Sequence, residues 1–236
     1  MTLPGLTPGA TVRYRVLAGT AHHRVATFTA PPAAGEPTRF IVLGDTRTMH
    51  VAHRSVVESA VPWMSHFLVN TGDLVTRGDS EAEWDAFFAV ERPLLATRIS
   101  YHAVGNHDRA GGGLAAFRRI LVQPSSAHAP ESEFAVDVGS VRLVVIDNGM
   151  TGTAGTEQKE WLEEVLATAG AAPGIRHVIV AVHHGIHSNG PHGPSKALWS
   201  AGIPAIMKMH GVDLVLAGHD HGYERGVVEG IRYMVT

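Results

Sequence analysis

The sequence lacks cysteine altogether, and this absence removes several kinds of site. Without thiolates the chain forms no disulfide, no iron–sulfur cluster and no thiolate zinc site, and it has no cysteine nucleophile. A chain without cysteine is compatible with oxidising and with reducing surroundings. The composition therefore leaves the compartment open.

Long apolar runs and an excess of charge of one sign are missing as well. No window reaches the roughly 18 uncharged apolar residues that a membrane-spanning helix needs. Residues 1–10 also lack the basic start and apolar run of a signal peptide. The chain has 19 basic and 22 acidic residues, a net charge of −3, and no long run of Lys or Arg. We therefore expect no membrane partner and no nonspecific binding to nucleic acid.

Histidine, by contrast, is abundant: the chain has 16 histidines beside its 19 Lys and Arg residues. With 236 residues, 44% of them apolar, the chain can bury one sizeable core. Histidine is the commonest metal ligand and the side chain that titrates nearest neutral pH. The positions of the histidines are therefore the main guide to function.

Short apolar runs alternate with helical patterns through most of the chain. We expect buried strands at 39–43, 67–69, 100–104, 141–146, 177–182 and 213–216, and helices at 81–95, 156–168 and 196–210. Residues 133–138 and 141–146 are predicted to pair as an antiparallel hairpin. Strands that alternate with helices predict an α/β domain with mixed sheets.

The N-terminal residues have a different pattern. Residues 11–17 and 24–29 alternate as two strands joined by a short turn, which predicts a β-hairpin. Residues 1–32 resemble the last strands of a fibronectin type III-like domain, residues 33–37 are predicted to be a linker, and 38–236 the main domain. The chain stops on a strand-like run at 231–236, and we expect the domain to continue beyond it.

Five of the expected strands end next to residues that can bind metal. The endings are GD at 44–45, GD at 72–73, GNHD at 105–108, HH at 183–184 and GHDH at 218–221. Taken singly, a GD pair is more often a turn or a helix cap, and a lone loop histidine is more often solvated. In open α/β sheets, however, ligands bind beyond the carboxyl ends of the strands, so these groups should converge. The ordered set favours a metal site.

The types of donor indicate the metal and the reaction. Imidazole, carboxylate and amide donors without sulfur suit Mn, Fe or Zn. Six candidate ligands exceed what one ion takes from protein, so we expect two divalent or trivalent ions bridged by a carboxylate, roughly 3.5–4 Å apart. Such a pair attracts a phosphate group and generates hydroxide from bound water near neutral pH.

The ordered set GD, GD, GNHD, HH and GHDH resembles the calcineurin-like metallophosphoesterase superfamily over residues 38–236. The N-terminal hairpin and the linker make the chain most similar to the purple acid phosphatase-like branch. The resemblance implies an α/β (α+β) fold, a four-layer β-sandwich flanked by helices, with residues 1–32 as the remnant of the accessory domain. It also implies a dinuclear phosphoester hydrolase in which metal-bound hydroxide attacks phosphorus, and a periplasmic or extracellular full-length parent.

The same resemblance implies a role for each matching residue. In it, Asp73 bridges the two metals, Asp45 and His221 hold the first metal, and Asn106, His183 and His219 hold the second.

Three further residues are implied to serve the substrate. His107 stands over the metals as an acid or phosphate-binding group, and Asp108 orients it. This fits the chemistry, because the leaving alkoxide needs a proton that an imidazolium can give. His192 corresponds to a histidine of the substrate pocket. For His184 and His187 a solvated loop position is equally compatible with the sequence, and Asp147 is predicted to have a capping or structural role.

The match departs from the family pattern at the first metal. Arg47 stands where most members have a histidine, and Thr76 stands where purple acid phosphatases have a tyrosine. An arginine cannot donate a lone pair. We therefore predict a protein that is not purple, whose first metal is bound weakly. Arg47 either contacts phosphate oxygens of the substrate or forms a salt bridge to a neighbouring acid, with equal weight.

The expected substrate is a small-molecule or nucleotide phosphoester. The resemblance to acid phosphatases favours a phosphomonoesterase. A phosphodiesterase or nucleotidase is the alternative, because fold and metals do not fix the substrate. A non-catalytic metal- or phosphate-binding module with a decayed site is the less favoured hypothesis. The sequence indicates no protein partner.

Overall fold

The computed structural model describes residues 3, 5–19, 21–126, 131–147 and 156–236 of the chain. Its strands are β1 (Thr11–Ala18), β2 (Ala21–Thr29), β3 (Phe40–Leu43), β4 (Phe67–Asn70), β5 (Ile99–His102), β6 (Phe134–Val138), β7 (Val141–Val145), β8 (His177–Ala181), β9 (Leu214–Ala217), β10 (Glu224–Val228) and β11 (Ile231–Val235). Its helices are α1 (His50–Ala60), α2 (Glu81–Leu95), α3 (Leu114–Ile120), α4 (Thr156–Ala169), α5 (Lys196–Ser200) and α6 (Ile203–Met209), with a 3-10 turn at Ala110–Gly112.

Two sheets form the centre of the main domain. One has three parallel strands in the order β3-β4-β5. The other has the order β10-β11-β9-β8-β7-β6, in which β11, β9, β8 and β7 are parallel and the two edge strands are antiparallel to their neighbours. The predicted hairpin of β6 and β7 is thus confirmed.

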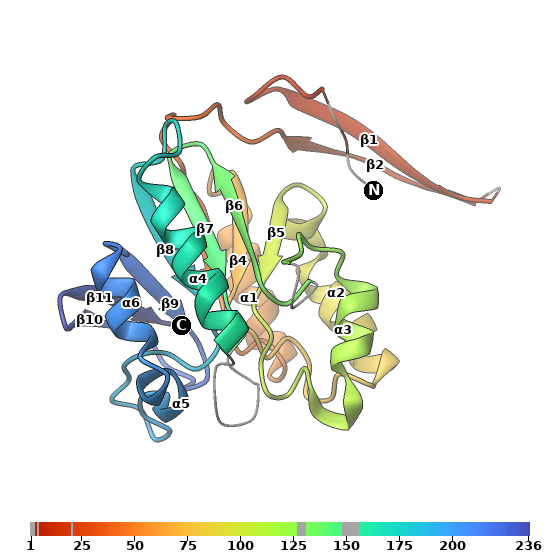
Figure 1. Cartoon of the computed structure of the whole chain (residues 1–236). Coiled ribbons are helices and arrows are strands. Elements are labelled where there is room, and N and C mark those ends of the chain that lie inside the picture. The colour runs from red at the N-terminus through yellow and green to blue at the C-terminus, as the bar shows by residue number, and fades with distance from the viewer. Residues whose placement is uncertain (1–2, 4, 20, 127–130, 148–155) are drawn as a thin grey trace.

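The sheets and helices stack in four layers. The inner faces of both sheets share one core, in which Phe67 and Tyr101 from the smaller sheet meet Leu143 and Ile179 from the larger. Helices α4 and α6 cover the outer face of the larger sheet, and Figure 1 shows α4 lying along β7 and β8. Helices α1 and α2 cover the smaller sheet in another core. The four-layer sandwich that the resemblance implied is confirmed.

The helices differ from the sequence expectation at three places. Helices α1 and α3 were not predicted, because α1 buries only His53 and Val57 and so shows little apolar periodicity. The single helix expected at 196–210 is divided into α5 and α6. Gly202 lies between them with a left-handed φ of 74°, and Pro204 begins the next turn. Both features end a helix and allow another to start in a new direction.

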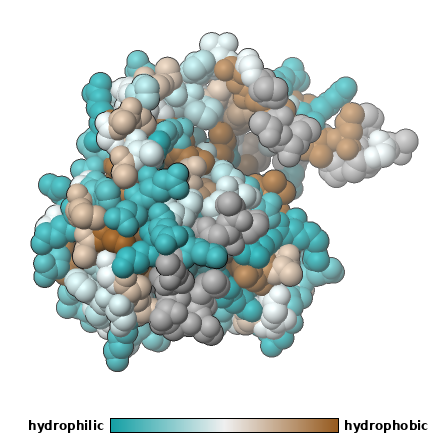
Figure 2. Space-filling view, viewed as in Figure 1, coloured by the Kyte–Doolittle hydropathy of each residue, from teal (hydrophilic) through white to brown (hydrophobic). Residues whose placement is uncertain are grey.

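The N-terminal hairpin is present and extends away from the sandwich (Figure 1). The Tyr14 hydroxyl anchors it by donating to the carbonyl of Ala96 at 2.8 Å. Val16 and Val25 are exposed, and Figure 2 shows hydrophobic surface along the hairpin. Its assignment to a fibronectin-like domain stays a prediction. Among the described residues, no helix combines the length and apolar character required to cross a membrane.

Candidate metal centre

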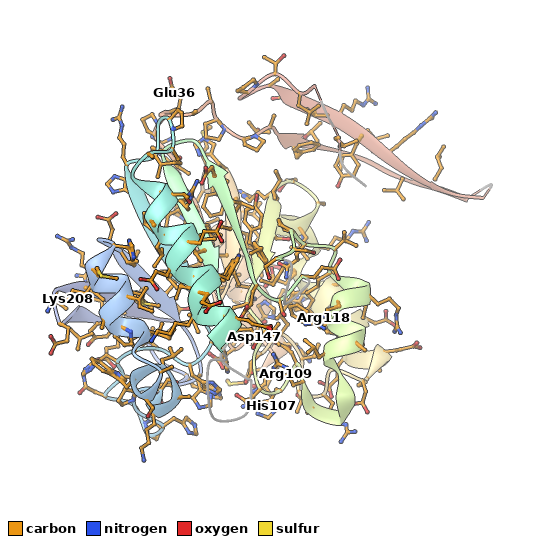
Figure 3. All side chains as sticks on the ribbon, in the orientation of Figure 1. Glu36, His107, Arg109, Arg118, Asp147 and Lys208 are labelled. Carbon is orange, nitrogen blue, oxygen red and sulfur yellow. The ribbon has the colours of Figure 1, made fainter. Side chains whose placement is uncertain are left out.

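The predicted site lies at one edge of the sandwich, where strands of both sheets end. Asp45, Asp73 and Asn106 follow β3, β4 and β5, and His183 and His219 follow β8 and β9. Figure 3 shows His107, Arg109 and Asp147 together at this end, with Glu36 at the opposite end. The two sheets thus bring together the side chains that the sequence motifs indicated.

The backbone at this edge is conformationally restrained. Asp45, Asp73, His219 and His221 all have positive φ, at 52°, 56°, 72° and 27°. Such conformations are uncommon for residues other than glycine and cluster at functional sites. Gly105 allows the GNHD loop to lie against Asp73, because a Cβ at this position would collide with the Asp73 carboxylate.

The position predicted for the second metal has a convergent set of donors. His183 Nε2 lies 3.1 Å from Asn106 Oδ1 and 3.4 Å from Asp73 Oδ1. The Nδ1–H of His183 donates to the Thr71 carbonyl at 2.9 Å, which leaves a lone pair on Nε2 for a metal. The His219 ring centroid lies 5.1 Å from that of His183. Nitrogen and oxygen donors in this arrangement fit Mn, Fe or Zn.

His184 also belongs to this group, which the sequence did not settle. It is half-buried, and its ring centroid lies 4.0 Å from that of His219 and 4.9 Å from that of His183. One nitrogen from each of these three rings lies within 4.8 Å of the others. Burial lowers the pKa of His184 to about 3, so the ring is neutral. The sequence feature that could have indicated His184 is its position directly after His183, a predicted ligand at a strand end.

The other two histidines of this loop, His187 and His192, lie in different surroundings. The His192 ring centroid lies 4.2 Å from that of His219, at the edge of the site, and its backbone N–H donates to Asp220 Oδ1 at 2.8 Å. His187 instead packs on Tyr233, with ring centroids 4.8 Å apart. The structure therefore places His192 beside the metal donors, and its role in binding substrate stays a prediction.

The position predicted for the first metal has fewer donors. Asp45 Oδ2 accepts the backbone N–H of His219 at 2.7 Å, and Asp45 Oδ1 lies 3.4 Å from His221 Nε2. Asp45 Oδ1 is buried and has no hydrogen bond within the described part of the chain. Arg47 lies among these groups and contacts both Asp73 and His221. The Thr76 hydroxyl donates to the backbone carbonyl of Arg47 at 3.4 Å.

The two carboxylates are electrostatically different. Burial raises the pKa of Asp45 above its ordinary value. Burial alone would also raise the pKa of Asp73, but its hydrogen bond and charge interaction with His183 hold this pKa below its usual range. The surroundings therefore favour the ionised form of Asp73 more than that of Asp45.

His107 and Asp108 have contacts that differ from the expected ones. The His107 Nδ1–H donates to the Thr76 carbonyl at 3.0 Å, and its Nε2 lies 4.0 Å from Asp73 Oδ2. Asp108 is fully buried, and its carboxylate accepts backbone N–H groups instead of contacting the His107 ring. These N–H groups belong to Gly105, Asp73, Leu74 and Val75. Asp108 therefore positions the loop that carries His107, and the carbonyl of Thr76 orients the ring.

Arg109 is a further residue near the site that the sequence did not indicate. Its guanidinium pairs with Asp147 at the end of β7. The Asp147 backbone N–H donates to Glu133 Oε1 at 3.1 Å. This ion pair ties the GNHD loop to the larger sheet (Figure 3). Asp147 thus has Arg109 as its partner, and the capping or structural role expected of it stays a prediction.

Comparison with known proteins agrees with this geometry. A family model described as calcineurin-like phosphoesterase matches residues 38–223. An uncharacterised protein of Mycobacterium tuberculosis is 24% identical over 265 residues, covering 94% of this chain and 49% of that protein. Probable purple acid phosphatase 20 of Arabidopsis thaliana is 26% identical over 227 residues, covering 91% and 52%. Purple acid phosphatase PPD1 from yellow lupin seeds has the same fold, with a TM-score of 0.78, 18% identity, and coverage of 98% of this chain and 50% of that one.

The chain spans about half the length of these curated relatives. The family match includes all five strand-end motifs and most of the chain. The chain belongs to the calcineurin-like phosphoesterase family, and purple acid phosphatases are among the proteins that it resembles.

Proposed function

We propose that the protein is a metal-dependent phosphoester hydrolase that acts best on phosphomonoesters, with a small-molecule or nucleotide phosphoester as substrate. The observation that carries the proposal is the convergence of Asp73, Asn106, His183 and His219 at the carboxyl ends of strands from both sheets. These donors would hold a divalent ion, which supplies Lewis-acid chemistry and lowers the pKa of bound water. The names of the purple acid phosphatase relatives support the choice of a monoester.

His107 is suited to protonate the leaving group. With its Nδ1–H donating to the Thr76 carbonyl, its Nε2 is the nitrogen available for substrate. The side chain is one-third exposed (32%), on the same side as the Asp73 carboxylate. A protonated Nε2 at this position can give its proton to a departing alkoxide. His192, at the edge of the same cluster, would contact the substrate.

The number of ions is a finer question. The two-ion centre expected from the sequence stays a prediction. The donors at its two positions differ: one position has Asp73, Asn106, His183 and His219, and the other has Asp45, Asp73 and His221 beside a guanidinium.

Hydrolysis of two model substrates tests the proposal. The chain is stripped of metal, restored with Mn, Zn or Fe, and assayed with p-nitrophenyl phosphate and bis-p-nitrophenyl phosphate side by side. We expect metal-dependent turnover that is faster for the monoester. Asp73→Asn should abolish it, because the variant loses a charged ligand, whereas Asp85→Asn on the exposed side of α2 should not change it.

The other outcomes select the alternatives. Faster turnover of the diester would assign a phosphodiesterase. Binding of metal without turnover of either compound with any metal would assign a non-catalytic module.

A further inference from the structure

A built-in cation lies where the first metal would bind. Arg47 Nε donates to Asp73 Oδ2 at 3.2 Å, and Arg47 Nη2 lies 3.3 Å from His221 Nε2. The two contacts use one donor atom from each of two residues that the first metal would need. The Arg47 side chain is largely buried, with 17% of its surface exposed. The guanidinium is thus packed into the site and does not extend into solvent.

The remaining groups at this position form a poor metal site. Asp45 supplies one free oxygen, Oδ1, since its Oδ2 accepts the N–H of His219. The His221 side chain is about half exposed (53%), so it lies at the rim. The Thr76 hydroxyl is directed to the backbone carbonyl of Arg47 and holds the arginine loop. The guanidinium of Arg47 occupies lone pairs of Asp73 and His221, and it has no lone pair of its own to offer a metal.

The charges at the site are consistent with an arginine in this role. Asp45 and Asp73 lie close together, with an oxygen of each within 4.8 Å of a His183 nitrogen. Two neighbouring carboxylates repel each other unless cations lie near them. A guanidinium stays protonated at every physiological pH and binds carboxylate and phosphate oxygens with its fork of N–H groups. Arg47 therefore provides permanently one of the positive charges that a metal pair would provide.

We propose that the Arg47 guanidinium takes the place of the first metal ion, so that the protein binds a single ion, at the position of Asp73, Asn106, His183 and His219. The part that Arg47 plays toward a substrate phosphoryl group depends on the proposed function. The number of ions bound does not.

Metal stoichiometry tests the inference without an activity assay. The metal-free chain is titrated with Mn²⁺ by calorimetry and, after dialysis against excess Mn²⁺, its metal content is measured. We expect one ion per chain for the wild type and for Arg47→Lys, which keeps the charge. Arg47→His replaces the cation with a ligand and should bind two. Arg77→His, at an exposed arginine in the loop after β4, is the matched control and should bind one.

Electron paramagnetic resonance gives an independent readout. Wild-type protein with Mn²⁺ should give the signal of an isolated ion, and Arg47→His should give that of a spin-coupled pair. A coupled pair and two ions in the wild type would overturn the inference, as would Arg47→His remaining at one ion while folded by circular dichroism. Two ions with turnover would overturn only the role of Arg47. One ion without turnover would overturn only the proposed function.

Discussion

At the scale of single residues, Asp108 shows how the GNHD loop is held. Burial raises the pKa of its carboxyl to about 6, so it is mostly ionised at neutral pH, and it accepts four backbone N–H bonds. These bonds join the loop after β4 to the loop after β5. One buried carboxylate thereby fixes the relative position of Asp73 and His107.

Asp108→Asn should therefore destabilise the protein. The asparagine amide offers one acceptor oxygen and an NH₂ group that faces backbone donors, so buried N–H groups lose their partners. We expect a loss of about 3 kcal/mol in the free energy of unfolding. Urea denaturation of the metal-free protein at pH 7.5 measures it. The control Asp85→Asn, on the exposed side of α2, should stay within about 0.5 kcal/mol of wild type, and equal values for both variants would contradict the argument.

Gly105 is the second residue that restrains the site. Gly105→Ala puts a methyl group against the Asp73 carboxylate, so either the GNHD loop or Asp73 must move. We expect the affinity for Mn²⁺ to fall at least tenfold, about 1.4 kcal/mol, because Asn106 and Asp73 no longer meet the same ion. Calorimetric titration measures the affinity. Gly170→Ala, where the added Cβ meets no atom within 4 Å, should leave it unchanged. Unchanged binding in Gly105→Ala would show that the close approach is not required.

At the scale of elements, helices α1 and α2 are joined by a buried polar pair. His53 Nε2 lies 2.7 Å from Glu91 Oε1, and both side chains are almost completely buried. Around them α1 and α2 pack Val57, Val90 and Leu94 against the smaller sheet. Because α1 begins a few residues after Asp45, this pair also supports the loop that carries Asp45 and Arg47.

Glu91→Ala should weaken this helix pair. The substitution leaves His53 buried without its partner and opens a cavity, so we expect a loss of about 3 kcal/mol in the free energy of unfolding. A double-mutant cycle with His53→Ala isolates the interaction, and the coupling energy should exceed about 0.5 kcal/mol. Strict additivity of the two single variants would show that the pair contributes nothing. Glu58→Ala, on the exposed side of α1, serves as the control.

At the scale of the whole molecule, the metal centre links two sheets that have no backbone hydrogen bonds to each other among the described strands. Asp73 and Asn106 follow strands of the smaller sheet, and His183 and His219 follow strands of the larger one. An ion bound by all four therefore acts as a cross-link between the layers. Any ligand that binds only the folded chain stabilises it by mass action.

Removing metal should consequently lower the melting temperature. At a free concentration one hundred times the dissociation constant, a bound ion adds about 2.7 kcal/mol, which is ~5–10 °C for a domain of this size. Differential scanning calorimetry with and without chelator measures the shift. In Asp73→Asn, removal of metal should change the melting temperature little. A change of the same size as in the wild type would place the stabilising ion elsewhere.

The sequence alone predicted much of the fold and the general location of the site. Helix α2 was predicted with its observed bounds, because its aromatic residues recur at helical spacing. The five strand-end motifs were identified because glycine and metal-capable residues directly follow apolar runs. Helix α1 and the break at Gly202 were not predicted, since a helix with few buried residues gives a weak pattern and one glycine is tolerated in many helices.

The sequence by itself determined the types of ligand, their order along the chain and the strands that they follow, because these depend on local patterns of neighbouring residues. Only the tertiary structure decided what each side chain contacts. Arg47 and His221 are separated by 174 positions in the chain, and they meet because the two sheets pack face to face and the loops at their ends adopt left-handed conformations. Local patterns carry no information on such contacts, which arise only when the layers assemble.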